Sequence, residues 1–129
     1  MYADVETFLA AWLGAALDIK TWADPDRDPG WRYEAPLAHI LRAPGEGDGA
    51  LTLDSALVDI DVYAVNADNA RTTAERIRKA IRVTLPGHTT SNGVSVQGTQ
   101  TTMAPIWTPD PKVKRRSATY RIFLHNPGL

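Results

Sequence analysis

Residues 55–65 read SALVDIDVYAV and carry the clearest structural signal in the chain. Every second side chain is apolar, which is typical of a strand with one face against a core. This expected core-facing set is Ala56, Val58, Ile60, Val62 and Ala64. The opposite face carries two carboxylates, Asp59 and Asp61, which project from the same side because side chains alternate along a strand. We therefore expect a strand here with one buried face.

A second strand is predicted just before it. Residues 36–43 read PLAHILRA, and Pro36 stands at the first position, where no ladder hydrogen bond is required. Between the two strands, Gly45, Gly47 and Gly49 predict a flexible turn. The two strands are expected to form a hairpin.

Two helices are predicted by apolar residues that recur three and four positions apart. The first covers residues 4–17, with two acidic residues in its first turn, where they favour the positive end of the helix dipole. The second begins at Asn66 or Asp68, either of which can cap it, and runs to about Leu85. Pro86-Gly87 then ends it.

The remaining segments predict two further strands and their connections. We expect strands over 93–102 and 117–125, joined by a rigid proline-rich connection over 105–111. Residues 18–22 suggest a short additional strand, and the acidic segment 24–30, with two prolines and a glycine, is expected to be a loop.

Together these elements predict the α+β class. Two hairpins separated by a helix would not be stable alone in water, so they most simply join into one antiparallel β-sheet with two helices packed on it. The expected order is α-β-β-α-β-β. At 129 residues the chain has the size of one ordinary domain, and we expect a single domain over residues 1–129.

The composition excludes several classes of protein. Hydrophobic residues make up 43% and charged residues 22%, which is typical of globular proteins and not of disordered or fibrous ones. No apolar run approaches the roughly 20 residues needed to span a membrane, and the acidic N-terminal residues argue against a signal peptide. The absence of cysteine excludes disulfides and thiolate metal sites, and it fits a reducing cytoplasm.

The net charge of −1 hides an uneven distribution. Residues 1–68 hold thirteen acidic and four basic side chains, a charge of −9, whereas residues 69–129 hold two acidic and ten basic ones, a charge of +8. One interpretation is that these charges lie on solvated faces. The other is that opposite charges meet across a head-to-tail contact between copies, which should weaken as salt rises.

Asp59 and Asp61 are the most tempting catalytic pair, because two carboxylates on one strand face could bind Mg²⁺. A nuclease built on them could also use Asp110 and Lys112, but a two-metal site needs further ligands nearby. The simpler interpretation is that both aspartates face water.

Other chemistries lack their sequence context. His39, His88 and His125 are not spaced like zinc ligands. No serine lies in a nucleophile elbow, and the glycines at 45–49 precede no helix, as a phosphate-binding loop would require. We expect no catalytic residues, no metal site, no cofactor and no enzymatic activity.

The densest basic cluster precedes the last expected strand and consists of Lys112, Lys114, Arg115 and Arg116. Three interpretations stay open: a solvated loop, a nucleic-acid patch assisted by Trp107 and Tyr120, or a contact with an acidic partner. Trp22, Trp31 and Trp107 are expected in or beside loops, where aromatic residues often anchor protein contacts. These tryptophans and the basic cluster form the expected subunit or partner interface.

Three parts of the chain resemble the tail terminator proteins of siphophages and related prophages. They are the amphipathic helix that begins with DVE (4–6), the strands LAHILR (37–42) and ALVDIDVYA (56–64) with the alanine-containing helix that follows, and the ending ATYRIFLHNP (118–127). The strand that feeds directly into the helix is the most family-like part.

The resemblance implies a structural virion protein that closes the head-proximal end of the tail tube, stops tube polymerisation and presents the surface that joins the head. The implied partners are copies of the chain itself, commonly in a homo-hexameric ring, the tail tube protein, and a head-completion or neck protein. Such a protein is assembled in the host cytoplasm and ends in the virion tail; DNA passes through it without specific binding, and no membrane is involved. Two alternatives stay open: a neck or head-completion adaptor of similar fold, and a small metal-dependent nuclease.

An acidic lumen would suit the passage of DNA, because basic residues would bind its phosphates. Asp59 and Asp61, or another acidic set from the first half of the chain, are therefore expected to face the lumen and not to bind metal. Replacing both with lysine should leave the monomer folded, because substitutions on an exposed strand face cost little stability, and should impair DNA ejection or infectivity.

Overall fold

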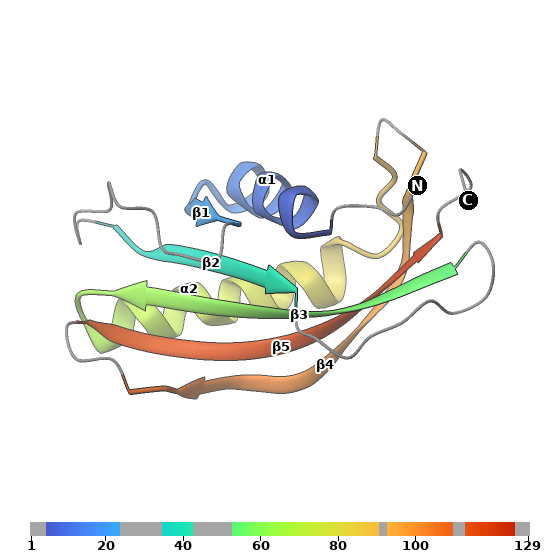
Figure 1. The fold of residues 1–129 in the computed structure, drawn as a ribbon. Coiled ribbons are helices and arrows are strands. Elements are labelled where there is room, and N and C mark those ends of the chain that lie inside the picture. Colours follow the sequence, from blue (N-terminus) through green and yellow to red (C-terminus); the bar gives the residue numbers. More distant parts are fainter. Residues whose placement is uncertain (1–4, 24–34, 43–52, 91–92, 110–112, 126–129) are drawn as a thin grey trace.

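The structure is a computed structural model, and it describes residues 5–23, 35–42, 53–90, 93–109 and 113–125 (Figure 1). The fold is α+β, as predicted: one five-stranded sheet and two helices. In chain order the elements are α1 (Val5–Leu17), β1 (Lys20–Trp22), β2 (Leu37–Arg42), β3 (Leu53–Ala64), α2 (Ala67–Lys79), the π-helical turn η1 (Ala80–Thr84), β4 (Ser95–Trp107) and β5 (Lys114–His125). Among these described elements, no helix is both long and apolar enough to cross a membrane.

The strands lie in the order β1-β2-β3-β5-β4. The pairs β2–β3, β3–β5 and β5–β4 are antiparallel, but β1 pairs with β2 in parallel, with Lys20 opposite Leu37 and Trp22 opposite His39. The predicted all-antiparallel sheet and the order α-β-β-α-β-β are therefore wrong at β1. Three residues are too few for an alternating pattern to show, so the sequence could only suggest this strand.

The position of β1 depends on close packing against α1. The Thr21 hydroxyl donates a hydrogen bond of 2.8 Å to the carbonyl of Ala10 in the helix. Gly14, one turn later, permits this approach, because a Cβ there would lie 3.3 Å from Thr21 Oγ1. A larger residue at position 14 would push β1 away from the helix.

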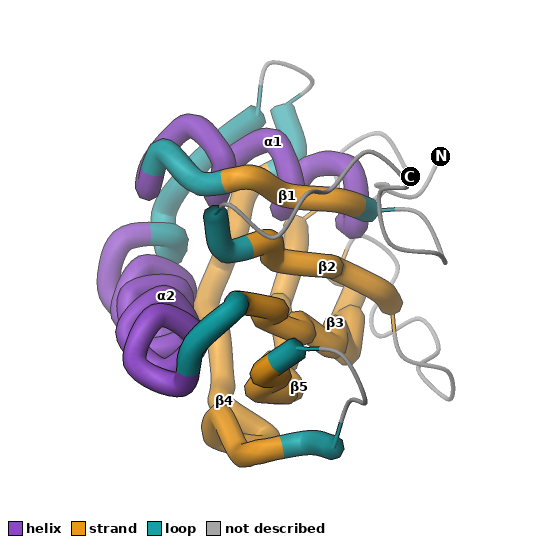
Figure 2. Tube along the Cα trace, turned by 90° about the vertical axis from the view of Figure 1, so that its left-hand side faces the viewer, coloured by secondary structure: helices purple, strands orange, loops and turns teal. Residues whose placement is uncertain are grey.

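Both helices lie on one face of the sheet, with α1 over β1 and β2 and α2 over the other three strands (Figure 2). The predicted core face of β3 is confirmed, since every member from Ala56 to Ala64 is buried. Its partners in a common core include Leu9 and Leu13 of α1, Ile77 of α2, Ile81 of η1, and Ile122 and Leu124 of β5.

The second helix starts and ends close to the predicted residues. Asn66 is its N-cap, and its side-chain oxygen accepts a 2.8 Å hydrogen bond from the Asn69 amide. The helix finishes in η1, where the Leu85 amide donates to the Ala80 carbonyl at 2.9 Å. Hydrogen bonds then tie η1 to the edge strand: Arg82 donates to the carbonyl and the hydroxyl oxygen of Thr99, and the Thr99 hydroxyl donates to the Ile81 carbonyl.

The last two strands are longer than predicted. β4 continues to Trp107, so Pro105 and Ile106 belong to a strand and not to a proline-rich connection. β4 is an edge strand with irregular pairing around Met103, and a proline without an N–H is tolerated there. β5 likewise begins at Lys114, not at residue 117.

Candidate functional site

The predicted aspartates lie on the face of the sheet that no described helix covers (Figure 2). β3 places Asp59 beside Thr119 and Asp61 beside Ser117 of β5, its neighbour on one side. On the other side, β2 places His39 opposite Asp61. This uncovered face brings together residues that lie far apart in the sequence.

Both carboxylates are bound by side chains of β5. Arg115 donates to Asp61 at 2.9 Å, and its guanidinium also lies over the Tyr63 ring, 5.6 Å from the ring centroid. The Thr119 hydroxyl donates to Asp59 at 2.6 Å. Because the Asp61 side chain is only 13% exposed, this ion pair is better shielded from water than an ordinary surface pair.

The interpretation that these aspartates simply face water is therefore wrong. Asp59 is half-buried and hydrogen-bonded, and Asp61 is nearly buried and ion-paired. The expectation that two lysines at these positions would leave the monomer folded loses its basis, since it depended on exposure. Alternation along β3 correctly indicated the shared face, but the partners come from β5, whose register cannot be read from local periodicity.

The structure gives little support to a metal site. No group of three or more metal-ligating side chains occurs within the described residues. His39 is buried in β2, His88 packs against α1, and His125 ends β5, so these strands and loop do not bring the histidines together. Asp110 and Lys112, the further residues of a possible nuclease, lie outside the described residues.

A hollow of about 500 Å³ lies on the uncovered face around this pair of aspartates. Its lining mixes carboxylates, hydroxyls and apolar groups: Leu41, Asp59, Asp61, Met103, Thr108, Arg115, Ser117, Ala118 and Thr119. The Thr108 hydroxyl donates to Ser117 Oγ at 2.9 Å, and no histidine lines the hollow to act as a base for that serine. The hydrogen bond joins the residue after β4 to β5.

The basic cluster lies in a strand and not in a loop. Lys114, Arg115 and Arg116 are the first three residues of β5, while Lys112 is outside the described residues. Their side chains alternate, so that Arg115 reaches Asp61 on the uncovered face while Arg116 lies over Trp107, 4.2 Å from the ring centroid. The cluster is therefore divided between two faces of the sheet.

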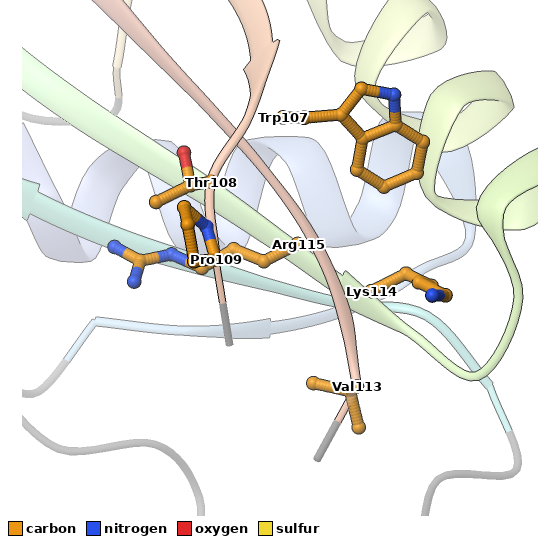
Figure 3. A pocket seen from close by; sticks show the side chains of 6 residues that line it. All are labelled: Trp107, Thr108, Pro109, Val113, Lys114 and Arg115. Carbon is orange, nitrogen blue, oxygen red and sulfur yellow. The ribbon is translucent and has the colours of Figure 1, made fainter. Parts of the chain in front are cut away.

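A second hollow, of about 290 Å³, lies where β4 ends and β5 begins (Figure 3). Trp107, Thr108, Pro109, Val113, Lys114 and Arg115 line it. Trp107 is 47% exposed, and tryptophan is among the residues that most often anchor protein contacts.

The other predicted interface tryptophans have different positions. Trp22 belongs to β1, where it is half-buried and packs against the small cluster of Leu37, Tyr63 and Val113 on the uncovered face. It is the last residue of the short strand that residues 18–22 suggested, and it packs within the subunit. Trp31 lies outside the described residues.

Tyr120 cannot stack on nucleic-acid bases as the nucleic-acid interpretation required, because it is buried in the core. Burial raises the pKa of its hydroxyl above the ordinary value, with a smaller lowering effect from Arg78. The hydroxyl has no hydrogen-bond partner among the described residues. A buried polar group in this state costs stability.

We predict that Tyr120→Phe raises the free energy of unfolding by about 1 kcal/mol, because it removes an unsatisfied buried hydroxyl. The gain should grow above about pH 10. There Tyr120 ionises in the unfolded wild-type protein but stays protonated in the folded one, because burial raises its pKa, so the stability of the wild type falls as pH rises. The phenylalanine variant has no such group and does not lose this stability. Urea unfolding of both proteins at neutral and alkaline pH measures the difference. A less stable phenylalanine variant would mean that the hydroxyl has a partner.

An aromatic contact that the sequence did not reveal joins α1 to the segment after η1. The rings of Phe8 and His88 stack with centroids 5.7 Å apart, and Trp12 lies 6.2 Å from His88. They border a hollow of about 290 Å³ together with Ala11 and Thr90. No local pattern connects residues so distant in the sequence.

No model of a known protein family matches the chain, and no curated protein matches it either. The case for a function therefore depends on the geometry and on the resemblance noted in the sequence.

Proposed function

We propose that this chain is a structural subunit that works by binding copies of itself and neighbouring proteins. The observation that carries the proposal is that Asp59 and Asp61 hold β3 to β5 through Thr119 and Arg115. At the end of the β4–β5 pair, half-exposed Trp107 instead offers the kind of side chain that anchors protein contacts.

Within that class, the tail terminator of a siphophage or related prophage is the best-supported member. The support is the resemblance along 4–14, 37–42, 56–74 and 118–127 together with the α+β fold. In this role, copies form a ring on the head-proximal end of the tail tube, stop its growth and bind a neck protein. A neck or head-completion adaptor is the alternative.

The proposed lumen assignment needs one adjustment. Asp59 and Asp61 lie on the sheet face that no described helix covers, and we propose that this face lines the passage. Arg115 compensates the charge of Asp61, so Asp59 supplies most of the negative charge that would repel DNA phosphates. Replacing Asp59 with asparagine therefore tests the lumen with less disturbance than a lysine.

The main test is the mass of the full chain in solution, measured by size-exclusion chromatography with light scattering. We expect an oligomer at about 0.05 M salt that dissociates progressively towards about 1 M, because the contact is expected to join opposite charges. A terminator should also stop polymerisation of purified tail tube protein, whereas a neck adaptor should not.

Three other outcomes would change the conclusion. A monomer that neither assembles nor binds tail tubes contradicts the assembly role. An oligomer indifferent to salt keeps that role but excludes an electrostatic contact. Magnesium-dependent DNA cleavage that is lost in Asp59→Ala would favour the nuclease.

A further inference from the structure

The end of the β4–β5 pair has positive charge that no described carboxylate pairs with, beside an exposed ring. We define the hairpin-end surface as Trp107, Pro109, Lys114 and Arg116. Pro109 and Lys114 are exposed, Trp107 is about half exposed, and Trp107 and Lys114 extend to the same side of β5 in Figure 3. The surface therefore combines apolar rings with cations, and it borders a hollow of about 290 Å³.

The two cations of this surface lack a counter-ion in the described part of the subunit. Arg115, their neighbour, pairs with Asp61, but neither Lys114 nor Arg116 contacts a carboxylate among the described residues. Arg116 is half-buried and lies over Trp107, with its guanidinium 4.2 Å from the ring centroid. An acidic ligand would supply what these groups lack.

The apolar part of the surface restricts the choice of ligand. A ligand with only acidic groups would pair with the two cations but would make no contact with the Trp107 ring. Proline-containing peptides dock on exposed aromatic rings with a small loss of entropy, because the proline ring restricts the backbone in advance. The best ligand is thus a segment in which aspartates and prolines alternate.

This chain carries such a segment, and it lies outside the described residues. Residues 24–29 read DPDRDP, with three aspartates, two prolines and one arginine. We propose that the hairpin-end surface binds this DPDRDP segment of a second copy, with its prolines on Trp107 and its aspartates on Lys114 and Arg116. The inference rests on the proposed assembly function and names the contact through which copies join.

Because each copy carries one surface and one segment, the contact is heterologous and can repeat around a ring. The proposed contact also accounts for part of the charge imbalance between the two halves of the chain, because the acidic DPDRDP segment lies in the first half and the basic hairpin-end surface in the second. Binding to the segment of the same chain is the competing arrangement, and single-stranded nucleic acid is the competing ligand, since it too combines negative charge with stacking groups.

The test uses two charge-swapped versions of the full chain. One carries Lys114→Glu and Arg116→Glu, so that both sites are acidic; the other carries Asp24→Lys and Asp26→Lys, so that both sites are basic. Each alone should lose self-association by about tenfold or more, and an equimolar mixture should regain the wild-type mass, because every contact then joins opposite charges. The mass is measured by light scattering at low salt.

A matched control makes the same change of charge elsewhere. Arg71→Glu with Lys79→Glu reverses two exposed cations on α2 and should assemble like wild type. Circular dichroism and thermal unfolding check that each variant folds. The change at half-buried Arg116 can prevent folding. In that case the single variant Lys114→Glu, at an exposed residue, is mixed with the single variant Asp24→Lys, and the same comparison is made with one charge pair instead of two.

Several results would overturn the inference. If wild type never associates, both this contact and the assembly function fail. If wild type associates but the mixture does not recover, or the separate variants assemble normally, this contact fails and the assembly function survives. Variants that lose stability but keep their mass would indicate binding within one chain. A labelled single-stranded DNA that binds wild type but not Lys114→Glu/Arg116→Glu would indicate a phosphate site.

Discussion

Replacing both Asp59 and Asp61 with lysine is expected to lower the free energy of unfolding by about 3–5 kcal/mol. The change removes the 2.9 Å ion pair of Asp61 with Arg115 and the 2.6 Å hydrogen bond that Thr119 donates to Asp59. It also places two new cations beside Arg115, on a face where the Asp61 side chain is only 13% exposed. Breaking a shielded pair leaves a charge without compensation, which is costly.

Urea unfolding followed by circular dichroism measures this loss. Asp68→Lys is the matched control, because Asp68 also pairs with an arginine but its side chain is 86% exposed. That control should change stability by less than about 1 kcal/mol. If the double variant were as stable as the control, the contacts to Arg115 and Thr119 would contribute nothing to folding.

This expectation affects how the lumen is tested. If the chain has the proposed terminator role, loss of infection with two lysines would follow from misfolding alone and would not show that the passage of DNA depends on these charges. Asp59→Asn avoids this difficulty, since an amide oxygen can still accept the hydrogen bond from Thr119. Normal infection with the asparagine variant would count against an acidic lumen at this position.

Ile122→Ala is expected to lower the free energy of unfolding by about 3 kcal/mol. Ile122 is fully buried in β5, between Ala56 of β3 and Thr99 of β4, and it belongs to the core shared with both helices. Removing its side chain forfeits apolar burial and leaves a cavity that neighbouring strands cannot close easily.

Chemical denaturation of the wild type and of Ile122→Ala measures this loss as a lower midpoint denaturant concentration, with an unchanged dependence of the unfolding free energy on denaturant. Val83→Ala serves as control, because Val83 is 70% exposed and should cost less than about 0.5 kcal/mol. A loss below about 1 kcal/mol for Ile122→Ala would show that the core around β5 can rearrange to fill the space.

Local pattern in the sequence was enough for most elements. Alternation from Ala56 to Ala64 identified both β3 and its buried face, and the spacing of Leu9 and Leu13 identified α1. Asn66 capped α2 as one of the two expected residues. These predictions succeeded because the side-chain period of a strand or helix and the chemistry of a cap depend on neighbouring residues alone.

Predictions failed where the outcome depended on another part of the chain. Pro105 indicated a connection, but its place on a sheet edge allows β4 to continue past it. Lys114, Arg115 and Arg116 seemed to form one patch, but pairing with β3 extends β5 and sends these side chains to opposite faces. The nucleic-acid interpretation used Tyr120 as a stacking residue, but Tyr120 is buried in the core.

The sequence by itself thus established the α+β class, the two helices and the two carboxylates on one strand face, because each follows from local periodicity. Only the tertiary structure decided that β1 runs parallel to β2, that Arg115 and Thr119 hold the aspartates, and that Phe8 stacks on His88. The physical reason is that strand order and register are set by how all elements share one core, and no short stretch of sequence contains that information.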